Sequence, residues 1–447
     1  MRKKIILLLC LMCVLLVACS NAESEETVAG TICSTPLAES ENTEHIHVEE
    51  TSKPTSASET TPTEAPTEIP TEPPTEPVAE LIEEGLQVYL EGGDETSVLC
   101  DHNIWTKRRI QNHQQLTLVC DTPFSGVYFV WDSIPGRYTI TWSNGKVEGG
   151  EYGFLHDYIR LPEAITQCTI EFLGEGDRRL CDVEVLTEGT APDGIQAWLP
   201  PCEEADILVF PTHADDDTLF FGPLISYYAI ERGLRVQTAF MVEHHGYPER
   251  GHERLNGLWE MGIRYYPILG TAPDTASYNI RETLQYYADS NIEQWQVEQI
   301  RRFKPLVVVG HDLEGEYGNA GHMVNALFLV RAIESAADEQ EFPESADQYG
   351  LWTTPKLYLH LYPENEIILD VNVPMEKDPE GRTPFQTAEA GFACHKSQHQ
   401  YGFHVQQGKN RVYDCRPFGL YRTLVGYDTC ADIMENIDVQ KWRDCAS

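Results

Sequence analysis

A histidine and three consecutive aspartates follow a short apolar run in the middle of the chain. The run covers residues 207–210, and the polar side chains belong to His213, Asp215, Asp216 and Asp217. A buried strand that ends in this way delivers polar side chains to the carboxyl edge of a parallel sheet, where open α/β sheets bind their ligands. The turn could be an exposed acidic cap on the next helix. Alternatively, a divalent cation would convert the repulsion between the carboxylates into ligation.

The spacing in this turn suits metal-dependent hydrolysis. A metal ion could take the imidazole of His213 and a carboxylate oxygen of Asp216, three residues later. Asp215 lies between them on a different azimuth and would be free to accept a proton from the attacking water. The turn therefore offers two ligands and a separate base.

A catalytic zinc ion usually takes three protein ligands, so a third is expected from another strand end. Residues 306–309 are the obvious second strand. His311 follows this strand directly, whereas His322 lies at the start of the next helix beside Gly318 and Gly321. Closeness to the strand favours His311 and exposure at the helix mouth favours His322, so these observations leave the choice open.

Four segments of the chain, in this order, resemble motifs of the PIG-L (LmbE-like) family of zinc-dependent N-deacetylases. They are 212–217 (THADDD; P-H-P-D-D-E in the family), 250–253 (RGHE; R-x-x-E) with 261–263 (MGI; L-G-V), 316–322 (EYGNAGH; E-Y-G-H-x-x-H) and 393–398 (ACHKSQ; A-x-H-x-S-Q). Each match is weak alone, but their order and their places on the expected elements strengthen them together.

The resemblance implies roles for individual residues. It makes His213, Asp216 and His322 the zinc ligands and Asp215 the general base. Tyr317 falls where the family uses a tyrosine to hydrogen-bond the developing oxyanion. Zinc is the implied cofactor, and another divalent transition metal is the alternative.

Arg250, Asn319 and His395 are the substrate-binding positions that the resemblance implies. Asn319 departs from the pattern, because the family commonly has a histidine there. An amide donates a hydrogen bond but cannot deliver a proton at neutral pH. The base would then also serve as the acid, or His244, His245 or His395 would substitute, or activity would be reduced.

The first residues resemble the signal peptide of a bacterial lipoprotein. Residues 2–4 are basic, and residues 5–17 form an apolar run that is short for a membrane span. The run closes on Leu-Val-Ala-Cys19, which resembles a lipobox. This implies cleavage before Cys19, a lipid on its sulfur and a location on the extracellular face of a bacterial membrane. An ordinary cleaved signal with a chance cysteine is the alternative.

Composition changes twice along the chain before the α/β region begins. Residues 20–80 are rich in Pro, Thr and Glu and have too few apolar residues to fold, so we expect a disordered tether. Residues 81–192 contain β-rich runs at 127–131, 138–142 and 169–172, and Asn144-Gly145 is a hairpin signal. They predict an all-β sandwich, similar to the jelly-roll modules of secreted carbohydrate enzymes.

Four aromatic residues of this β-rich segment have two possible roles. Trp131, Trp142, Tyr152 and Tyr158 could stack on sugar rings or could be core residues.

Strands and helices alternate in residues 196–447. This predicts an α/β domain with a Rossmann-like, mostly parallel sheet and helices on both faces. The expected strands are 207–210, 236–242 and 306–309, and the expected helices are 219–232, 250–261, 280–303 and 322–337. From residue 364 onward we expect loops, a strand or two and one helix.

Ten of the 13 cysteines remain after Cys10, Cys13 and Cys19 are set aside. In an exported protein they could form disulfides. Cys100, Cys120, Cys168 and Cys181 form a middle cluster, and Cys394, Cys415, Cys430 and Cys445 form a late one.

The formal net charge of −39 repels nucleic acid and anionic lipid and excludes both as expected partners. The leading hypothesis is a zinc-dependent hydrolase that removes an N-acetyl group from an amino sugar or glycan at the cell surface, attached to the membrane through Cys19. The alternative is a surface carbohydrate-binding lipoprotein with a weakened deacetylase-like domain, suggested by Asn319. The sequence does not indicate an oligomeric state.

Overall fold

The structure is a computed structural model that describes residues 76–93, 96–244 and 246–444. They belong to a compact unit that begins at Pro73. The predicted signal peptide, Cys19, nearly all of the predicted tether and His245 lie outside the described residues. None of the helices within them is long and apolar enough to cross a membrane.

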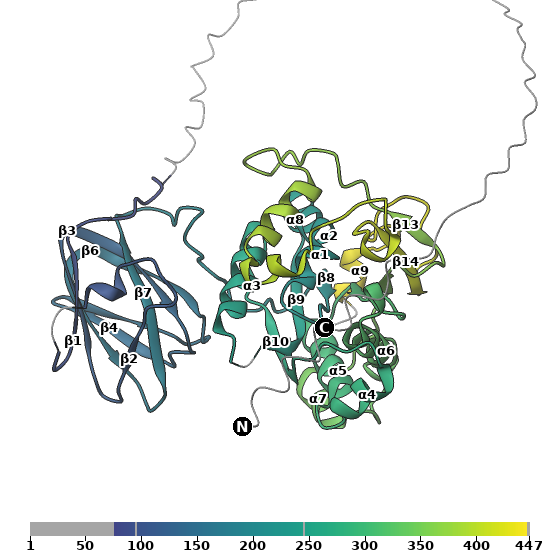
Figure 1. Cartoon of the computed structure of the whole chain (residues 1–447), viewed down its shortest axis with the longest axis horizontal. Helices are drawn as coiled ribbons and strands as arrows, with labels where there is room; N and C mark the ends of the chain where they lie inside the picture. Colours follow the sequence, from purple (N-terminus) through teal and green to yellow (C-terminus); the bar gives the residue numbers. More distant parts are fainter. Residues whose placement is uncertain (1–75, 94–95, 245, 445–447) are drawn as a thin grey trace, which may run out of the picture. The chain divides into compact units, whose positions relative to one another are not determined.

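The described residues contain two seven-stranded sheets in a mixed α/β fold (Figure 1). The strands of the first sheet are β1 (Leu86–Leu90), β2 (Arg108–Ile110), β3 (Leu116–Trp131), β4 (Tyr138–Trp142), β5 (Gly145–Gly149), β6 (His156–Phe172) and β7 (Arg178–Leu186). Their order is β2-β7-β3-β6-β4-β5, with β1 paired to β3, and every pairing is antiparallel. The long strands β3 and β6 shift register along their ladder, and the sheet is a curled half-barrel. The predicted sandwich of two separate sheets is therefore corrected to one continuous sheet.

The aromatic residues of this first sheet serve mainly as core. Trp131 is fully buried, Trp142 is nearly so and Tyr158 is half-buried, whereas Tyr152 is exposed. The predicted hairpin joins β4 to β5. A Cβ at Gly145 would lie 2.6 Å from a ring carbon of Trp142, so packing of the indole requires the glycine. Trp131 is therefore unavailable as a sugar-stacking surface, whereas Trp142 contributes to the lining of a second cavity.

The second sheet supplies the strand ends that the sequence singled out. Its strands are β8 (Ile207–Val209), β9 (Val236–Glu243), β10 (Ile268–Pro273), β11 (Val307–Gly310), β12 (Lys356–His360), β13 (Glu366–Ile368) and β14 (Pro417–Thr423). Their order is β10-β9-β8-β11-β12-β14-β13. The pairings from β10 to β12 are parallel, and the two that involve β14 are antiparallel. Neighbouring β8 and β11 are buried throughout, which explains their continuous apolar sequence.

The helices of this region form two groups, with strands of the second sheet between them in Figure 1. The first group contains α1 (Asp216–Leu219), α2 (Gly222–Ser226), α3 (Pro248–Glu260) and α8 (Pro384–Ala393). The second contains α4 (Ile280–Tyr286), α5 (Ile292–Phe303), α6 (Ala320–Ser335) and α7 (Pro343–Tyr349). The remaining helical segments are η2 (Ser97–Leu99), η3 (Tyr227–Glu231), η4 (Glu316–Gly318), η5 (Lys396–Tyr401), η6 (Arg411–Tyr413) and α9 (Val439–Asp444).

Two predicted helices are broken in the structure. The segment 219–232 divides because Pro223, which has no backbone N–H, lies in the first turn of a new helix, α2, that begins at Gly222. The segment 280–303 divides into α4 and α5, and Asn291 adopts a left-handed conformation with φ 48° before α5. The described residues after 364 contain two α-helices, α8 and α9, whereas the sequence predicted one helix there.

The expected disulfides do not form among the described cysteines whose state the structure defines. Cys120, Cys168, Cys181, Cys202, Cys394, Cys415 and Cys430 have free thiols. On the paired strands β3 and β6, Cys168 lies opposite Leu118 and not opposite Cys120. A disulfide requires closer and better-aligned Cα atoms than this register gives.

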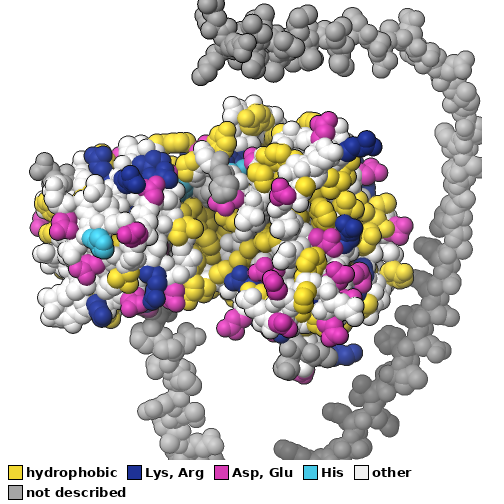
Figure 2. Space-filling view, turned by 90° about the horizontal axis from the view of Figure 1, so that it is seen from below, with side chains coloured by type: hydrophobic (Ala, Val, Ile, Leu, Met, Phe, Trp, Pro, Cys, Tyr) yellow, Lys and Arg dark blue, Asp and Glu magenta, His cyan; other side chains and the backbone are white. Residues whose placement is uncertain are grey.

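The acidic composition is visible on the molecular surface. Figure 2 shows many Asp and Glu side chains with hydrophobic side chains between them. Exposed hydrophobic residues are ordinary when they are scattered, so only those that gather at a cavity call for an explanation.

Candidate active site

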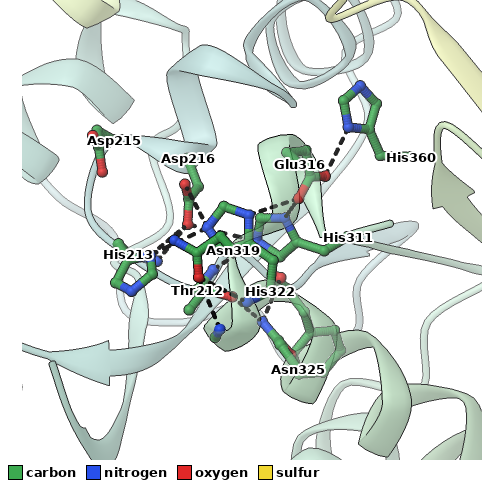
Figure 3. Close-up of polar contacts among 12 residues, drawn as sticks. Thr212, His213, Asp215, Asp216, His311, Glu316, Asn319, His322, Asn325 and His360 are labelled. Atoms are coloured by element: carbon green, nitrogen blue, oxygen red, sulfur yellow. Dashed lines mark hydrogen bonds and ion pairs between the residues drawn. The ribbon is translucent and has the colours of Figure 1, made fainter. Parts of the chain in front are cut away.

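Three buried ligand-type side chains meet at the ends of two neighbouring strands. His213 and Asp216 follow β8, and His322 lies in the first turn of α6, after β11. Nδ1 of His213 is 3.2 Å from Oδ2 of Asp216 and 3.3 Å from Nε2 of His322. That Nε2 is 3.2 Å from Oδ1 of Asp216 (Figure 3). The two segments are thus brought together as the sequence predicted.

The chemistry of this trio fits a divalent cation. Nδ1 of His322 donates to Oε2 of Glu316 at 2.7 Å, which leaves a lone pair on Nε2. This lone pair faces Nδ1 of His213 and the carboxylate of Asp216, and their ligand atoms all lie within 4.8 Å. Two imidazole nitrogens and a carboxylate oxygen are a donor set that zinc takes in proteins.

His311, the competing third ligand, has both ring nitrogens engaged. Nε2 accepts a hydrogen bond of 2.9 Å from the backbone N–H of Thr212, and Nδ1 lies 2.8 Å from Oε2 of Glu316. His311 therefore has no lone pair left for a metal ion. The geometry favours His322 over His311.

Glu316 connects three histidines behind the trio. Its carboxylate accepts from His311 and His322 on one oxygen and from His360 at 2.7 Å on the other (Figure 3). Burial would raise the pKa of the Glu316 carboxyl, but the three histidines hold it well below its usual range. The anion fixes the ring orientation of His322 from the side opposite to Asp216.

Asp274 has a similar position on the other side of the trio. Its Oδ1 is 3.6 Å from Nε2 of His213, and its Oδ2 is 3.0 Å from Nδ1 of His244. Nε2 of His244 accepts from the backbone N–H of Ala214 at 3.1 Å. Asp274 is therefore hydrogen-bonded to His244, which in turn is hydrogen-bonded to the turn after β8.

Asp215 lies apart from the three facing groups (Figure 3) and lines the adjoining cavity. Its Oδ1 accepts from Nη2 of Arg250 at 3.1 Å. Burial raises the pKa of the Asp215 carboxyl to about 6, against the opposing charge of Arg250. A carboxylate in this position can exchange protons near neutral pH.

Arg250 also bonds to the backbone carbonyl of Ala214, while its buried Nη1 has no partner among the described residues. One helical turn later, Glu253 accepts from the backbone N–H and the hydroxyl of Ser397, at 2.7 and 2.6 Å. Two of the sequence motifs are therefore joined, and they form one wall of the cavity.

Tyr317 and Asn319 lie together at the start of α6. Tyr317 has a left-handed conformation, with φ 48°, which is uncommon for a bulky residue. Asn319 caps the helix by accepting from the backbone N–H groups of Gly321 and His322 at 2.8 and 3.4 Å. Its amide donates to the Tyr317 hydroxyl at 3.2 Å. Burial raises the pKa of Tyr317, so its hydroxyl stays protonated and available to donate.

His395 lies away from the cavity surface. It is fully buried, and its two ring nitrogens have no hydrogen-bond partner among the described residues. A Cβ at Gly257 of α3 would lie 2.9 Å from its Nε2. His395 therefore packs behind the wall formed by α3 and is not placed to touch a ligand in the cavity.

A cavity of about 620 Å³ opens beside the trio. Its lining includes His213, Asp215, Asp216, Arg250, Tyr317 and Asn319. This volume lies within the range of small-molecule sites. Six of the eight residues predicted from sequence for the catalytic domain therefore line one cavity, while His322 and His395 do not.

Sequence reasoning did not assign roles to Glu316, Asp274, His360 or Asn325. Asn325 donates to the Thr212 hydroxyl at 2.9 Å and to the backbone carbonyl of Phe210 at 3.1 Å, fixing α6 against the turn after β8. Glu316 is the first residue of the segment 316–322 that resembles a family motif, and this position could have indicated a role at the site. Asp274 and His360 have no spacing relation to the motifs, and only the fold brings them to the site.

Comparison with known proteins gives a partial match, and no known family profile matches the chain. The chain is 24% identical over 206 residues to 1D-myo-inositol 2-acetamido-2-deoxy-alpha-D-glucopyranoside deacetylase 1 of Catenulispora acidiphila. The match covers 40% of this chain and 62% of that protein.

Among solved structures, the chain is similar to N,N'-diacetylchitobiose deacetylase from Pyrococcus horikoshii, at 14% identity, with a TM-score of 0.34, covering 45% of this chain and 76% of the other. It is also similar to a conserved protein of Thermus thermophilus, at 17% identity, with a TM-score of 0.31 and coverage of 44% and 81%.

Proposed function

We propose that this chain is a metal-dependent hydrolase that removes an N-acyl group, acetyl in particular, from an amino sugar. The observation that supports this function most strongly is the trio His213, Asp216 and His322. Asp215 lies beside the trio without being part of it, and it lines the adjoining cavity. The name of the Catenulispora relative describes a deacetylase of an acetamido sugar, which supports the same substrate class.

The trio would hold the metal ion, zinc by its donor set, which when bound polarises the amide carbonyl and activates the attacking water. Asp215 accepts the proton of that water. Tyr317 donates its hydroxyl hydrogen to the oxygen on which negative charge develops. The amide of Asn319 holds this hydroxyl in place.

The products are a carboxylate and a free amine, and the leaving nitrogen needs a proton. Asp215 can return the proton that it accepted, because a carboxylate that serves as the base in the first step is the acid available in the next. Asn319 therefore need not act as an acid. Arg250, with its unpartnered Nη1, offers a donor to a sugar oxygen.

We also propose that the enzyme acts on a glycan at the extracellular face of a bacterial membrane. The lipobox-like sequence at Cys19 and the Pro/Thr/Glu-rich residues 20–80 support an anchored protein with a long tether. As part of the same proposal, the half-barrel sheet serves as an accessory module beside the catalytic region.

The test is an assay of acetate release from N-acetylglucosamine and its oligomers by the purified chain, with and without added zinc and after chelation. Metal-dependent release supports the proposal. Glycan binding without release from any acylated amino sugar would favour a carbohydrate-binding lipoprotein instead.

A further inference from the structure

Three exposed tyrosines contribute to the lining of the candidate active-site cavity. Tyr247, Tyr278 and Tyr401 line it, and their exposed fractions are 58%, 73% and 65%. Only six described tyrosines are more than half exposed, so half of them gather at this one cavity. We call these three the tyrosine rim. Such gathering indicates a binding surface, because isolated exposed aromatics are normally dispersed.

The rim comes from three segments that are far apart in the sequence. Tyr247 is the residue before α3, and Tyr278 lies in the loop between β10 and α4. The carbonyl of the adjacent Ser277 accepts from the backbone N–H of Ala320 at the start of α6, at 2.8 Å. Tyr401 ends η5, the segment that Glu253 anchors to α3. The contacts of the segments that carry Tyr278 and Tyr401 position these rings before a ligand binds, which lowers the cost of ordering them.

The charge of the cavity restricts what can occupy it. Asp215, Asp216, Glu249 and Asp274 contribute carboxylates to the lining, and Arg250 is its one Lys or Arg side chain. A divalent cation would compensate only part of this negative charge. An anionic ligand is therefore disfavoured, and a neutral polyhydroxyl chain is favoured.

We infer that the tyrosine rim forms additional sugar subsites, so that the enzyme prefers an uncharged oligosaccharide of N-acetylated amino sugars over the monosaccharide. This inference rests on the proposed function. The acetamido group of one sugar lies at the trio, and the neighbouring sugars stack their C–H faces on the exposed tyrosine rings that line the cavity. Aromatic rings provide a large apolar contact area of this kind together with a polar hydroxyl.

The experiment compares kcat/KM of the full chain for N-acetylglucosamine and its di-, tri- and tetrasaccharide. The inference predicts a rise with chain length, and a selective loss for the longer substrates in Tyr247→Ala, Tyr278→Ala and Tyr401→Ala. The ratio of tetrasaccharide to monosaccharide kcat/KM should fall by about 2- to 10-fold per ring, as expected of aromatic contacts. Phenylalanine variants should restore most of the ratio.

Tyr427 provides the matched control, because it is 67% exposed and does not line the cavity. Tyr427→Ala should leave the ratio unchanged. Equal kcat/KM for all chain lengths in an active wild-type enzyme would overturn the inference and leave the proposed function intact. Equal losses on monosaccharide and tetrasaccharide in the rim variants would also overturn it. An absence of acetate release from every substrate would instead contradict the proposed function.

Discussion

The backbone N–H of Thr212 donates a hydrogen bond of 2.9 Å to Nε2 of His311. This contact uses the nitrogen that His311 would need to bind a metal ion, and it favours His322 as the third ligand of the proposed metal site. His322→Ala should therefore lose bound metal, whereas His311→Ala should retain most of it. The measurement is the metal content of both purified variants by elemental analysis. Loss of metal from the His311 variant alone would reverse the ligand assignment.

Glu316 should control metal affinity without touching the metal ion. Glu316→Gln removes the anion that orients His322, and loss of such a partner typically weakens metal binding by about 10- to 100-fold. Competition with a chromophoric chelator measures this change. Glu314→Gln is the matched control, because Glu314 is exposed in the same loop. Equal affinity of the Glu316 variant and wild type, with both folded, would show that the carboxylate has no such role.

Two substitutions can separate the roles of Asn319. Asn319→Ala removes the helix cap and should lower the free energy of unfolding by about 1 kcal/mol. Asn319→Ser retains a capping oxygen and should cost much less, but it also lacks the amide that donates to Tyr317. Both variants should lose turnover to a similar extent. Denaturant unfolding and kcat give the two readouts, and full activity in the serine variant would show that the contact with Tyr317 is dispensable.

The short-range features of the site were accessible from the sequence, whereas its supporting contacts were not. His213, Asp215 and Asp216 follow a strand that the continuous apolar run revealed, and Tyr317 and His322 lie in a recognisable motif. The choice between His322 and His311 could not be made from the sequence, because it depends on a hydrogen bond between two residues that are 99 positions apart in the chain.

Other features depended on tertiary packing. Helix periodicity ran through Pro223 and predicted one helix where the proline starts another. The sequence predicted a sandwich in place of the half-barrel. The pattern of short β-rich runs does not reveal that β3 and β6 are long strands that continue across what would otherwise be two sheets. His395 matched a motif, but its burial behind α3 could not be read from its neighbours in the sequence.

Asp206 should make the stability of the α/β region dependent on acid pH. It lies just before β8, and Arg235 and Arg443 each approach its Oδ1 to 3.0 Å. Burial would raise the pKa of Asp206, but these hydrogen bonds hold it below its ordinary value. A carboxylate with a lowered folded-state pKa stabilises the protein above its unfolded-state pKa of about 3.9, and this stability is lost as the pH falls through the folded-state value.

Asp206→Asn should therefore lower the free energy of unfolding by about 1–3 kcal/mol near neutral pH, with a smaller difference from wild type below about pH 4. Urea unfolding across this pH range is the measurement. Glu204→Gln is the control, since Glu204 approaches the same arginines only at 3.4–3.8 Å and is partly exposed. Its effect should stay within about 0.5 kcal/mol. A pH-independent difference for Asp206→Asn would contradict the assignment.

The central claim is that Asp215 is the base of a metal-dependent N-deacetylase. The most direct measurement is acetate release from N-acetylglucosamine oligomers by wild type and Asp215→Asn, with the metal content of both determined in parallel. We predict that the variant keeps its metal, because Asp215 is not one of the three proposed ligands, and that its kcat falls by about 10²- to 10⁴-fold. Wild-type turnover in an Asp215→Asn enzyme that retains its metal would contradict the account.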